Sequence, residues 1–382
     1  MTPRAACAAR RREAERRHRR PTLAFALAAA LSPALALGQA AIRVNDTLYL
    51  RLGLQLQAWA DFAQTSAASA GDGYAQNLEL RRARFFLSGQ ASPDVSFYFL
   101  TDSPNLGAGT GSASNPKGFT PGFRVQDAWV EWKLAEPLAL VAGEMYVPFS
   151  RNELTSSSSY LTLDGSPMSS AFSSPTQTNG QRDTGVEAKG YLAGGHLEYR
   201  AAAFQGARQT GSRNAPLLAG YVQYDFLDTE KGYTYAGTNL GKKSVLAFAA
   251  GYETQAAYRA HSAAAFATIP VRAGDELAGI AQWTHYDGAA YSPSLADQND
   301  LLVELGYLVG AARLQPFAKI ERQRFADAAF RPNDLSRWGG GFNYYLRGQS
   351  LKLTGALVRT DPRNPQLRRS NEATLQLQVY YF

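Results

Sequence analysis

Hydrophobic and polar residues alternate along most of this chain. Between positions 47 and 62, in the stretch TLYLRLGLQLQAWADF, an apolar residue occupies every second position, and Arg51, Gln55 and Gln57 lie between them. Successive side chains of a β-strand point to opposite faces, so the stretch predicts one long strand with an apolar and a polar face. Two arrangements fit this strand alone: the leucines form the core of a soluble sandwich, or they face lipid around a water-filled barrel.

The same alternation recurs and predicts sixteen strands in all. A tilted strand crosses a bilayer in about 9–11 residues, and most of the predicted strands are of this order. Single-chain barrels of bacteria have an even number of strands. The predicted strands are residues 47–62, 78–91, 95–102, 123–133, 138–149, 183–191, 197–207, 216–227, 244–255, 257–269, 275–286, 300–309, 313–324, 335–346, 350–360 and 372–382.

The connections between the predicted strands alternate in length. Short turns such as 92–94 and 134–137 alternate with long polar loops such as 103–122 and 150–182. Outer-membrane barrels have short turns at the periplasmic rim and long loops at the other rim, whereas a soluble sandwich has no reason for this alternation. One connection breaks the rule, because 228–243 is long where a short turn is expected.

We therefore expect an all-β fold, namely a 16-stranded antiparallel transmembrane β-barrel. Closure pairs every backbone group and leaves no open edge in the membrane. A barrel of this size encloses an aqueous lumen. The leucines of the first strand should then face lipid, and Arg51, Gln55 and Gln57 should line water. The last strand ends in Phe382, which lies out of phase with the apolar positions before it.

The first forty residues have the features of a secretory signal peptide. The arginine-rich stretch RRREAERRHRR precedes the apolar run TLAFALAAALSPALALG, and Gly38 and Ala40 suit cleavage. Residues 1–40 carry eight arginines and two glutamates, a net charge of +6 out of +7 for the whole chain. The remaining charge of about +1 gives no reason to expect nucleic acid as a partner. The single cysteine, Cys7, also lies in this leader, so residues 41–382, the predicted barrel domain, have no disulfide or thiolate metal site.

Several stretches carry a family resemblance. They are GEMYVPFSRNELTSS (143–157), RDTGVEAKG (182–190), LVELGYLVG (302–310), LQPFAKIER (314–322) and FNYYLRGQSLKLT (342–354). Together they resemble the phosphate-selective porin O and P family of Gram-negative outer membranes. The resemblance implies a homotrimer of 16-stranded barrels, surrounded by outer-membrane lipid, with the long third loop (150–182) folded into the pore. It also implies passive diffusion of small hydrophilic solutes and ions, phosphate or other anions among them.

The resemblance further implies that arginines and lysines inside the pore select anions. Acidic residues share the same strand faces, and the pairs Glu131/Lys133, Glu187/Lys189, Glu198/Arg200 and Lys319/Glu321 stand two positions apart. Adjacent opposite charges cancel each other's field at a distance. We therefore expect at most a mild anion preference, with solvated wall charge as the alternative role of these cations. The candidates for an anion path are Arg82, Arg84, Arg151, Arg182, Arg51, Lys189, Arg200 and Lys319.

The sequence offers no catalytic motif. HExxH, G-x-S-x-G and Walker patterns do not occur, and His196, His261 and His285 are scattered. We therefore predict that the protein is not an enzyme and needs no metal or other cofactor. Two other functions stay open: a general non-selective diffusion pore, and a structural or adhesin barrel without specific anion binding. Single-channel conductance would separate a pore from a plugged barrel.

Overall fold

The computed structural model describes most of the predicted barrel domain. The described residues are 40–45, 47–64, 73–108, 123–166, 168, 181–208, 214–272, 274–288 and 295–382. The predicted signal peptide lies outside these residues apart from Ala40, so it stays a prediction. In the described part of the chain, no helix combines the length and apolar character needed to span a membrane.

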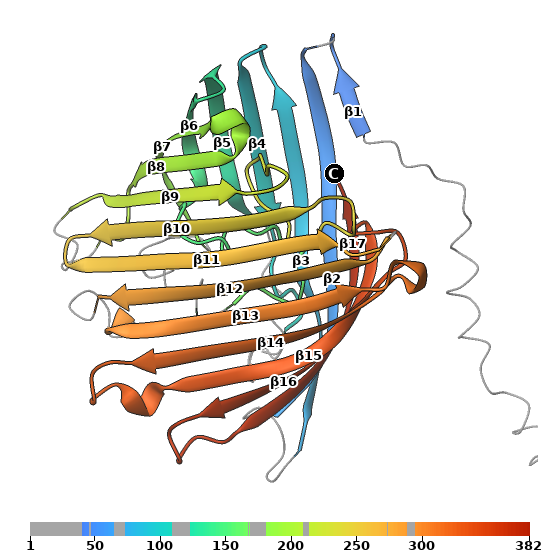
Figure 1. The fold of residues 1–382 in the computed structure, drawn as a ribbon, viewed down its shortest axis with the longest axis vertical. Helices are drawn as coiled ribbons and strands as arrows, with labels where there is room; N and C mark the ends of the chain where they lie inside the picture. Colours follow the sequence, from blue (N-terminus) through green and yellow to red (C-terminus); the bar gives the residue numbers. More distant parts are fainter. Residues whose placement is uncertain are drawn as a thin grey trace, which may run out of the picture. The chain divides into compact units, whose positions relative to one another are not determined.

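Strands β2 to β17 form a closed antiparallel barrel of sixteen strands. Each strand pairs with its neighbours in sequence, and β17 closes the ring on β2, from Tyr381 opposite Leu54 to Glu372 opposite Ala63 (Figure 1). All sixteen predicted strands are confirmed, with ends that shift by a few residues. The strands are β2 (Tyr49–Ala63), β3 (Ala75–Gln90), β4 (Val95–Asp102), β5 (Arg124–Ala135), β6 (Leu138–Tyr146), β7 (Arg182–Leu192), β8 (Leu197–Phe204), β9 (Leu217–Asp225), β10 (Val245–Gln255), β11 (Tyr258–Pro270), β12 (Glu276–Asp287), β13 (Gln298–Leu308), β14 (Leu314–Phe325), β15 (Leu335–Tyr345), β16 (Leu351–Pro362) and β17 (Ser370–Tyr381).

One further strand was not predicted. Strand β1 (Ala40–Arg43) pairs with residues 49–52 of β2, the part of β2 that β17 does not reach. It therefore covers backbone groups that would otherwise form an open edge. Four residues are too few for a pattern of alternation to be recognised in the sequence.

The apolar positions of the strands point outward and the polar positions point into the barrel. In β17, Leu375 and Leu377 are 47% and 46% exposed, whereas Gln376 and Gln378 are at most 1% exposed. This arrangement is the reverse of a soluble fold and suits a barrel surrounded by lipid. The expectation that the leucines of β2 face outward is confirmed, since Leu52 is 48% exposed.

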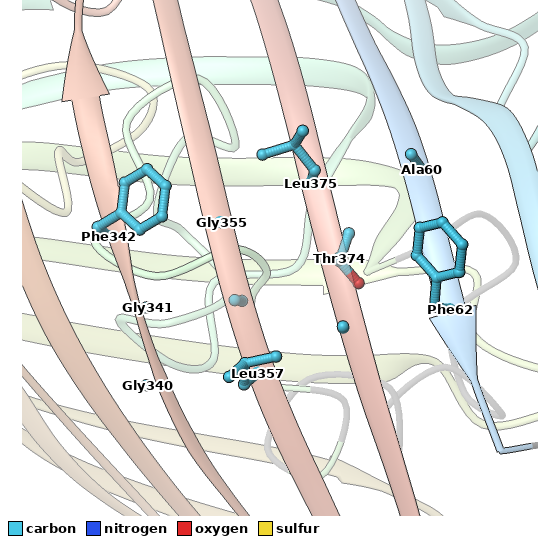
Figure 2. Close-up of a pocket in the computed structure, with 11 residues that line it drawn as sticks. Ala60, Phe62, Gly340, Gly341, Phe342, Gly355, Leu357, Thr374 and Leu375 are labelled. Atoms are coloured by element: carbon cyan, nitrogen blue, oxygen red, sulfur yellow. The ribbon is translucent and has the colours of Figure 1, made fainter. Parts of the chain in front are cut away.

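Figure 2 shows part of the outer face, where β2, β15, β16 and β17 lie side by side. A shallow hollow of about 480 Å³ lies there, with glycine and alanine between larger apolar side chains. Phe342 lies opposite Gly355 in the ladder, and Leu357 lies opposite Gly340. The pairing of large with small residues keeps the surface apolar, as contact with lipid acyl chains requires.

The irregular connection found in the sequence is real. Residues 226–244 join β9 to β10 at the rim of short turns, while only 256 and 257 join β10 to β11 at the other rim. The strands on either side were placed correctly. The extra residues do not extend the ladder; they contact the interior of the barrel, as described below.

Candidate functional site

The first part of the third loop runs along the inner wall of the barrel. We call residues 147–166 the third-loop segment. Gln57 Nε2 on β2 donates to the Ser157 carbonyl at 3.1 Å, and Asn343 Nδ2 on β15 donates to the Leu161 carbonyl at 2.8 Å. On β13, the Glu304 carboxylate accepts a hydrogen bond from Thr162 Oγ1 at 2.7 Å. The segment thus contacts strands on separate parts of the wall; residues 167 and 169–180 lie outside the described residues.

A glycine on β10 permits the chain to turn inward after β6. The Phe149 carbonyl accepts a hydrogen bond from Ser262 Oγ on β11 at 2.5 Å. The same carbonyl lies so close to Gly251 that a Cβ atom there would be 1.7 Å from it. Only glycine allows the two backbones to approach in this way.

A second segment enters the interior from the opposite rim. We call residues 226–244 the β9–β10 segment. It joins the third-loop segment in a short parallel bridge, in which Tyr235 N donates to the Leu154 carbonyl and Ser156 N donates to the Tyr235 carbonyl, both at 2.9 Å. Tyr233 also reaches the wall, because its hydroxyl donates to Asp127 and accepts from Tyr146 N. The unexpected length of this connection was its only signal in the sequence.

Arg151 of the third-loop segment forms an ion pair with the β9–β10 segment. Its guanidinium lies 2.7 Å from Glu230 and donates to Gln223 at 2.6 Å, and it stacks 3.8 Å from the centre of the Phe266 ring. Burial disfavours the charged guanidinium, but Glu230 outweighs burial and raises the pKa of Arg151. Removal of one partner from such a buried pair usually costs about 3–5 kcal/mol, since the other charge stays buried without compensation.

Most of the predicted anion-path residues contact an acid. The predicted pairs Glu198/Arg200 and Lys319/Glu321 are present, at 2.7 and 3.7 Å. Glu131/Lys133 and Glu187/Lys189 form no ion pair among the described residues, because Lys133 pairs with Glu136 and Lys189 pairs with Glu131. The six ion-paired candidates are Arg84 with Asp102 (2.9 Å), Arg151 with Glu230 (2.7 Å), Arg182 with Asp127 (3.1 Å), Lys189 with Glu131 (2.6 Å), Arg200 with Glu198 (2.7 Å) and Lys319 with Asp164 (3.1 Å).

Two buried cations differ from these six. Arg82 on β3 is 7% exposed and donates to Gln57 at 2.7 Å, while its Nε has no hydrogen-bond partner in the described part of the chain. Lys352 on β16 is 1% exposed and donates to the Tyr160 carbonyl at 3.4 Å. The Arg82 guanidinium lies 5.7 Å from the ring of the same Tyr160. Within the described residues neither side chain has an ion pair, and both lie beside Tyr160.

The last of the eight candidates, Arg51, lies away from this group. Its guanidinium packs 4.7 Å from the ring of Tyr49, near the start of β2. Arg51 is half-buried and has no ion pair in the described part of the chain.

Two interior cations were missed by the sequence reasoning. The pairing of β2 with β3 contains a β-bulge, in which Arg81 is the extra residue of β3 between the partners of Gln57 and Ala58. The guanidinium of Arg81 lies over the Trp59 ring. Arg337 on β15 lies 3.0 Å from Glu321 and 3.3 Å from Asp164. The bulge has no marker in the sequence. Arg337, in contrast, lies inside a predicted strand, and the alternation of that strand could have shown that its side chain points into the barrel.

Gln55 and Gln57 face the interior, as predicted, but they do not line open water. Each is 1% exposed, because the third-loop segment covers them. Gln55 accepts a hydrogen bond from Ser157 Oγ at 3.3 Å. The expectation of contact with open water is therefore wrong for both residues, because the alternation of a strand shows which way a side chain points but not which loop covers it.

Asp164 is the acid that the third-loop segment contributes to the strand cations. Burial alone raises its pKa, but Lys319 and Arg337 outweigh burial and hold the pKa of Asp164 well below its usual range. A carboxylate with a lowered pKa stabilises the fold above its unfolded-state value, and this contribution disappears as the pH falls through the folded-state value. The contact between Asp164 and the two cations should therefore persist at pH 4.

We expect Asp164→Asn to shift the selectivity of the pore toward anions. The change removes a negative charge that balances the positive charges of Lys319 and Arg337. The interaction between two such charges is worth about 1 kcal/mol in water-like surroundings. The reversal potential under a salt gradient in a planar bilayer measures the shift. Asp327→Asn, on an exposed loop, is the matched control and should change nothing. An unchanged reversal potential in Asp164→Asn would show that ions do not pass these cations.

A barrel that is apolar outside, polar inside and crossed by segments from both rims has the architecture of a porin. The profile of the phosphate-selective porin O and P family matches residues 52–317, and the chain belongs to this family. The protein is an outer-membrane channel of a Gram-negative bacterium, through which solutes diffuse passively. Within the described residues, no group of three or more His, Cys, Asp or Glu side chains could hold a metal ion.

Solved porin structures share the fold at low sequence identity. OmpF of Salmonella typhi, in a complex with daunomycin, is 13% identical, with a TM-score of 0.56 over 89% of this chain and 100% of that chain. OprB of Pseudomonas putida is 12% identical, with a TM-score of 0.59 over 86% and 94%. The outer membrane channel DcaP of Acinetobacter baumannii is 12% identical, with a TM-score of 0.54 over 89% and 99%. No curated protein matches this sequence.

Proposed function

We propose that this channel passes small hydrophilic solutes with a mild preference for anions. The observation that supports the proposal is the pairing of the interior charges. Six of the eight predicted cations each lie within 3.1 Å of an acid. Paired charges present little net field to a passing ion, so they select weakly.

The remaining preference for anions comes from the two unpaired cations beside the third-loop segment. Arg82 and Lys352 both lie beside Tyr160, and Ser157 and Ser158 stand three and two positions before it in the sequence. Serine hydroxyls and amides can replace the hydration of a solute without choosing its charge. The two cations would therefore stabilise an anion at this point, and the anion would lose little free energy of hydration. The third-loop segment acts here as the constriction of the pore.

The proposal is tested by removing both cations. We expect the double variant Arg82→Gln/Lys352→Gln to conduct with a lower anion-to-cation permeability ratio than the parent protein. Each lost cation is worth about 1 kcal/mol in water-like surroundings, which is roughly a fivefold change in anion occupancy. Reversal potentials under a potassium chloride gradient measure the ratio, and chloride replaced by phosphate tests whether the preference extends to that ion.

A control variant distinguishes this path from a general loss of positive charge. Arg363→Gln removes a cation that lies at the long-loop rim and is paired with Asp334 at 2.8 Å, so it should leave the ratio unchanged. A parent protein that prefers cations would refute the anion preference. A barrel that does not conduct would support the structural or adhesin alternative.

Three further properties belong to this proposal. Residues 1–40 act as a cleaved signal peptide, three copies of the barrel assemble as a trimer, and the protein has no enzymatic activity. The N-terminal sequence of the protein isolated from outer membranes tests the first property, and the mass of the detergent-solubilised complex tests the second. Turnover of lipid or peptide substrates that a histidine variant abolishes would contradict the third.

A further inference from the structure

A cavity of about 410 Å³ lies inside the barrel, beside the constriction. Strands β2 to β5 form one side of it, and Ser156 and Ser157 of the third-loop segment and Thr234 of the β9–β10 segment border it. We call this cavity the aromatic chamber. Its volume falls in the range of about 300–1,000 Å³ that small-molecule sites occupy. Its aromatic lining includes Phe86, Tyr98, Trp129, Tyr233, Tyr380 and Phe382.

The aromatic rings of the chamber contact one another and form a continuous wall. Tyr98 stacks on Trp129 with ring centres 5.5 Å apart and an angle of 25° between the planes. Tyr233 lies 4.9 Å from Trp129 and 5.8 Å from Tyr98. Because Tyr233 belongs to the β9–β10 segment, that segment completes the wall.

Phe382 adds the last ring of this wall. Its ring lies 5.3 Å from Phe86 and 6.0 Å from Tyr98. A Cβ atom on Gly53 of β2 would lie only 2.5 Å from the Phe382 ring, so glycine leaves the space that the ring uses. The out-of-phase position of Phe382 in the sequence thus corresponds to a side chain that lines the interior.

The polar groups of the chamber come as compensated pairs. Arg182 and Asp127, 3.1 Å apart, both line it, as does Arg84, whose partner Asp102 lies 2.9 Å away. An Arg–Asp pair carries no net charge but offers donors and acceptors side by side. A hydroxyl group can accept from the arginine and donate to the carboxylate at the same time.

Two donors at the chamber wall lack a hydrogen-bond partner within the described residues. Gln55 is 1% exposed and lines the chamber, and its Nε2 has no hydrogen-bond partner among the described residues. The indole Nε1 of Trp129 is likewise without a partner in the part of the chain that the structure describes. A buried donor left unpaired costs about 1–3 kcal/mol, so a solute oxygen at this place would recover free energy.

We propose that the aromatic chamber binds a neutral sugar ring, such as a hexose unit, during its passage through the channel. The ring faces of aromatic side chains carry partial negative charge, which attracts the C–H bonds of a sugar face and disfavours an anion lying flat on them. The Arg–Asp pairs and the two free donors match the hydroxyls at the edge of the sugar. This inference rests on the proposed function, since the solute must first enter the pore.

Maltose serves as the probe in planar bilayers, with ion current as the readout. The parent protein should show a saturable decrease of current with maltose concentration. Trp129→Leu and Tyr98→Leu should each raise the half-saturating concentration at least about tenfold, which corresponds to about 1.4 kcal/mol. Trp338→Leu, which removes an outward-facing tryptophan that is 50% exposed, is the matched control and should behave as the parent protein.

A second measurement separates binding from conduction. Maltose added to the protein in detergent should change its tryptophan fluorescence in the parent protein and not in Trp129→Leu. The heat-dependent mobility of each variant on gels shows whether its barrel is closed, and Trp129→Phe, which keeps a ring face, should bind maltose with intermediate strength.

Three results would overturn the inference. The first is an open channel without saturable block and without a fluorescence change. The second is a block of equal strength in the parent protein and Trp129→Leu. The third is a block by benzoate at concentrations where maltose has no effect, which would assign the chamber to organic anions. A protein that does not conduct but shows the fluorescence change would refute the proposed function and leave the chamber as a sugar site.

Discussion

Replacing residues 229–243 with the two residues Asn-Gly is expected to raise the single-channel conductance severalfold. Asp228 N donates to the Ser244 carbonyl at 2.8 Å, so positions 228 and 244 already face each other just beyond the end of the β9–β10 ladder. Asn-Gly is a preferred two-residue hairpin connection for such a pair. The barrel wall should therefore close as before, while the interior loses Glu230, Tyr233 and Tyr235.

The same change should loosen the third-loop segment. Arg151 loses Glu230 and becomes a buried cation without its partner, at a cost of about 3–5 kcal/mol. The parallel bridge to Tyr235 also disappears. We expect larger fluctuations of current in addition to the larger mean conductance.

A matched control shortens a connection that does not enter the interior. Residues 326–334 join β14 to β15, and their side chains are mostly exposed. Replacing residues 328–331 with Asn-Gly should leave the conductance close to that of the parent protein. If the 229–243 replacement conducts no more than this control, then ions do not pass the β9–β10 segment.

Gly251→Ala is expected to produce the second large effect, because the change adds a single methyl group where no space exists. The new Cβ would lie 1.7 Å from the Phe149 carbonyl oxygen and 2.9 Å from Ser262 Oγ. The start of the third-loop segment must then move away from β10. Overpacking of this kind usually costs about 1–3 kcal/mol, and here it should also widen the constriction.

The effect of Gly251→Ala can be measured in two ways. The midpoint of unfolding in guanidinium should fall, and single-channel conductance should rise. Gly220→Ala, on the neighbouring strand β9, is the control, since its nearest neighbour would be the Arg200 carbonyl oxygen at 3.9 Å. Equal behaviour of the two variants would mean that the close approach at Gly251 does not position the loop.

The barrel wall could be predicted from the sequence because each strand repeats the same signal. Leu375 and Leu377 alternate with Gln376 and Gln378, and the structure places the two sets on opposite faces. Strand length and the alternation of short and long connections then distinguish a membrane barrel from a soluble sandwich. A four-residue strand such as β1 contains too little of this signal.

The interior could be predicted only in part, because its contacts join residues that are distant in sequence. The parity of a strand shows that Lys189 faces inward, but not that Glu131 from β5 reaches it before Glu187 does. A bulge changes the parity without a marker, as at Arg81. The role of the eight candidate cations in anion passage stays a prediction.

The Thr155–Tyr235 bridge also has a mechanical consequence. The hydrogen bonds of the wall run around the circumference, so they resist stretching of the ring more than its flattening. The third-loop segment that carries this bridge starts at the end of β6 and is hydrogen-bonded to β2, β13 and β15, so it connects distant parts of the wall and opposes that flattening. This channel should therefore keep a rounder cross-section under lateral membrane pressure than a barrel of equal strand number without such a strut.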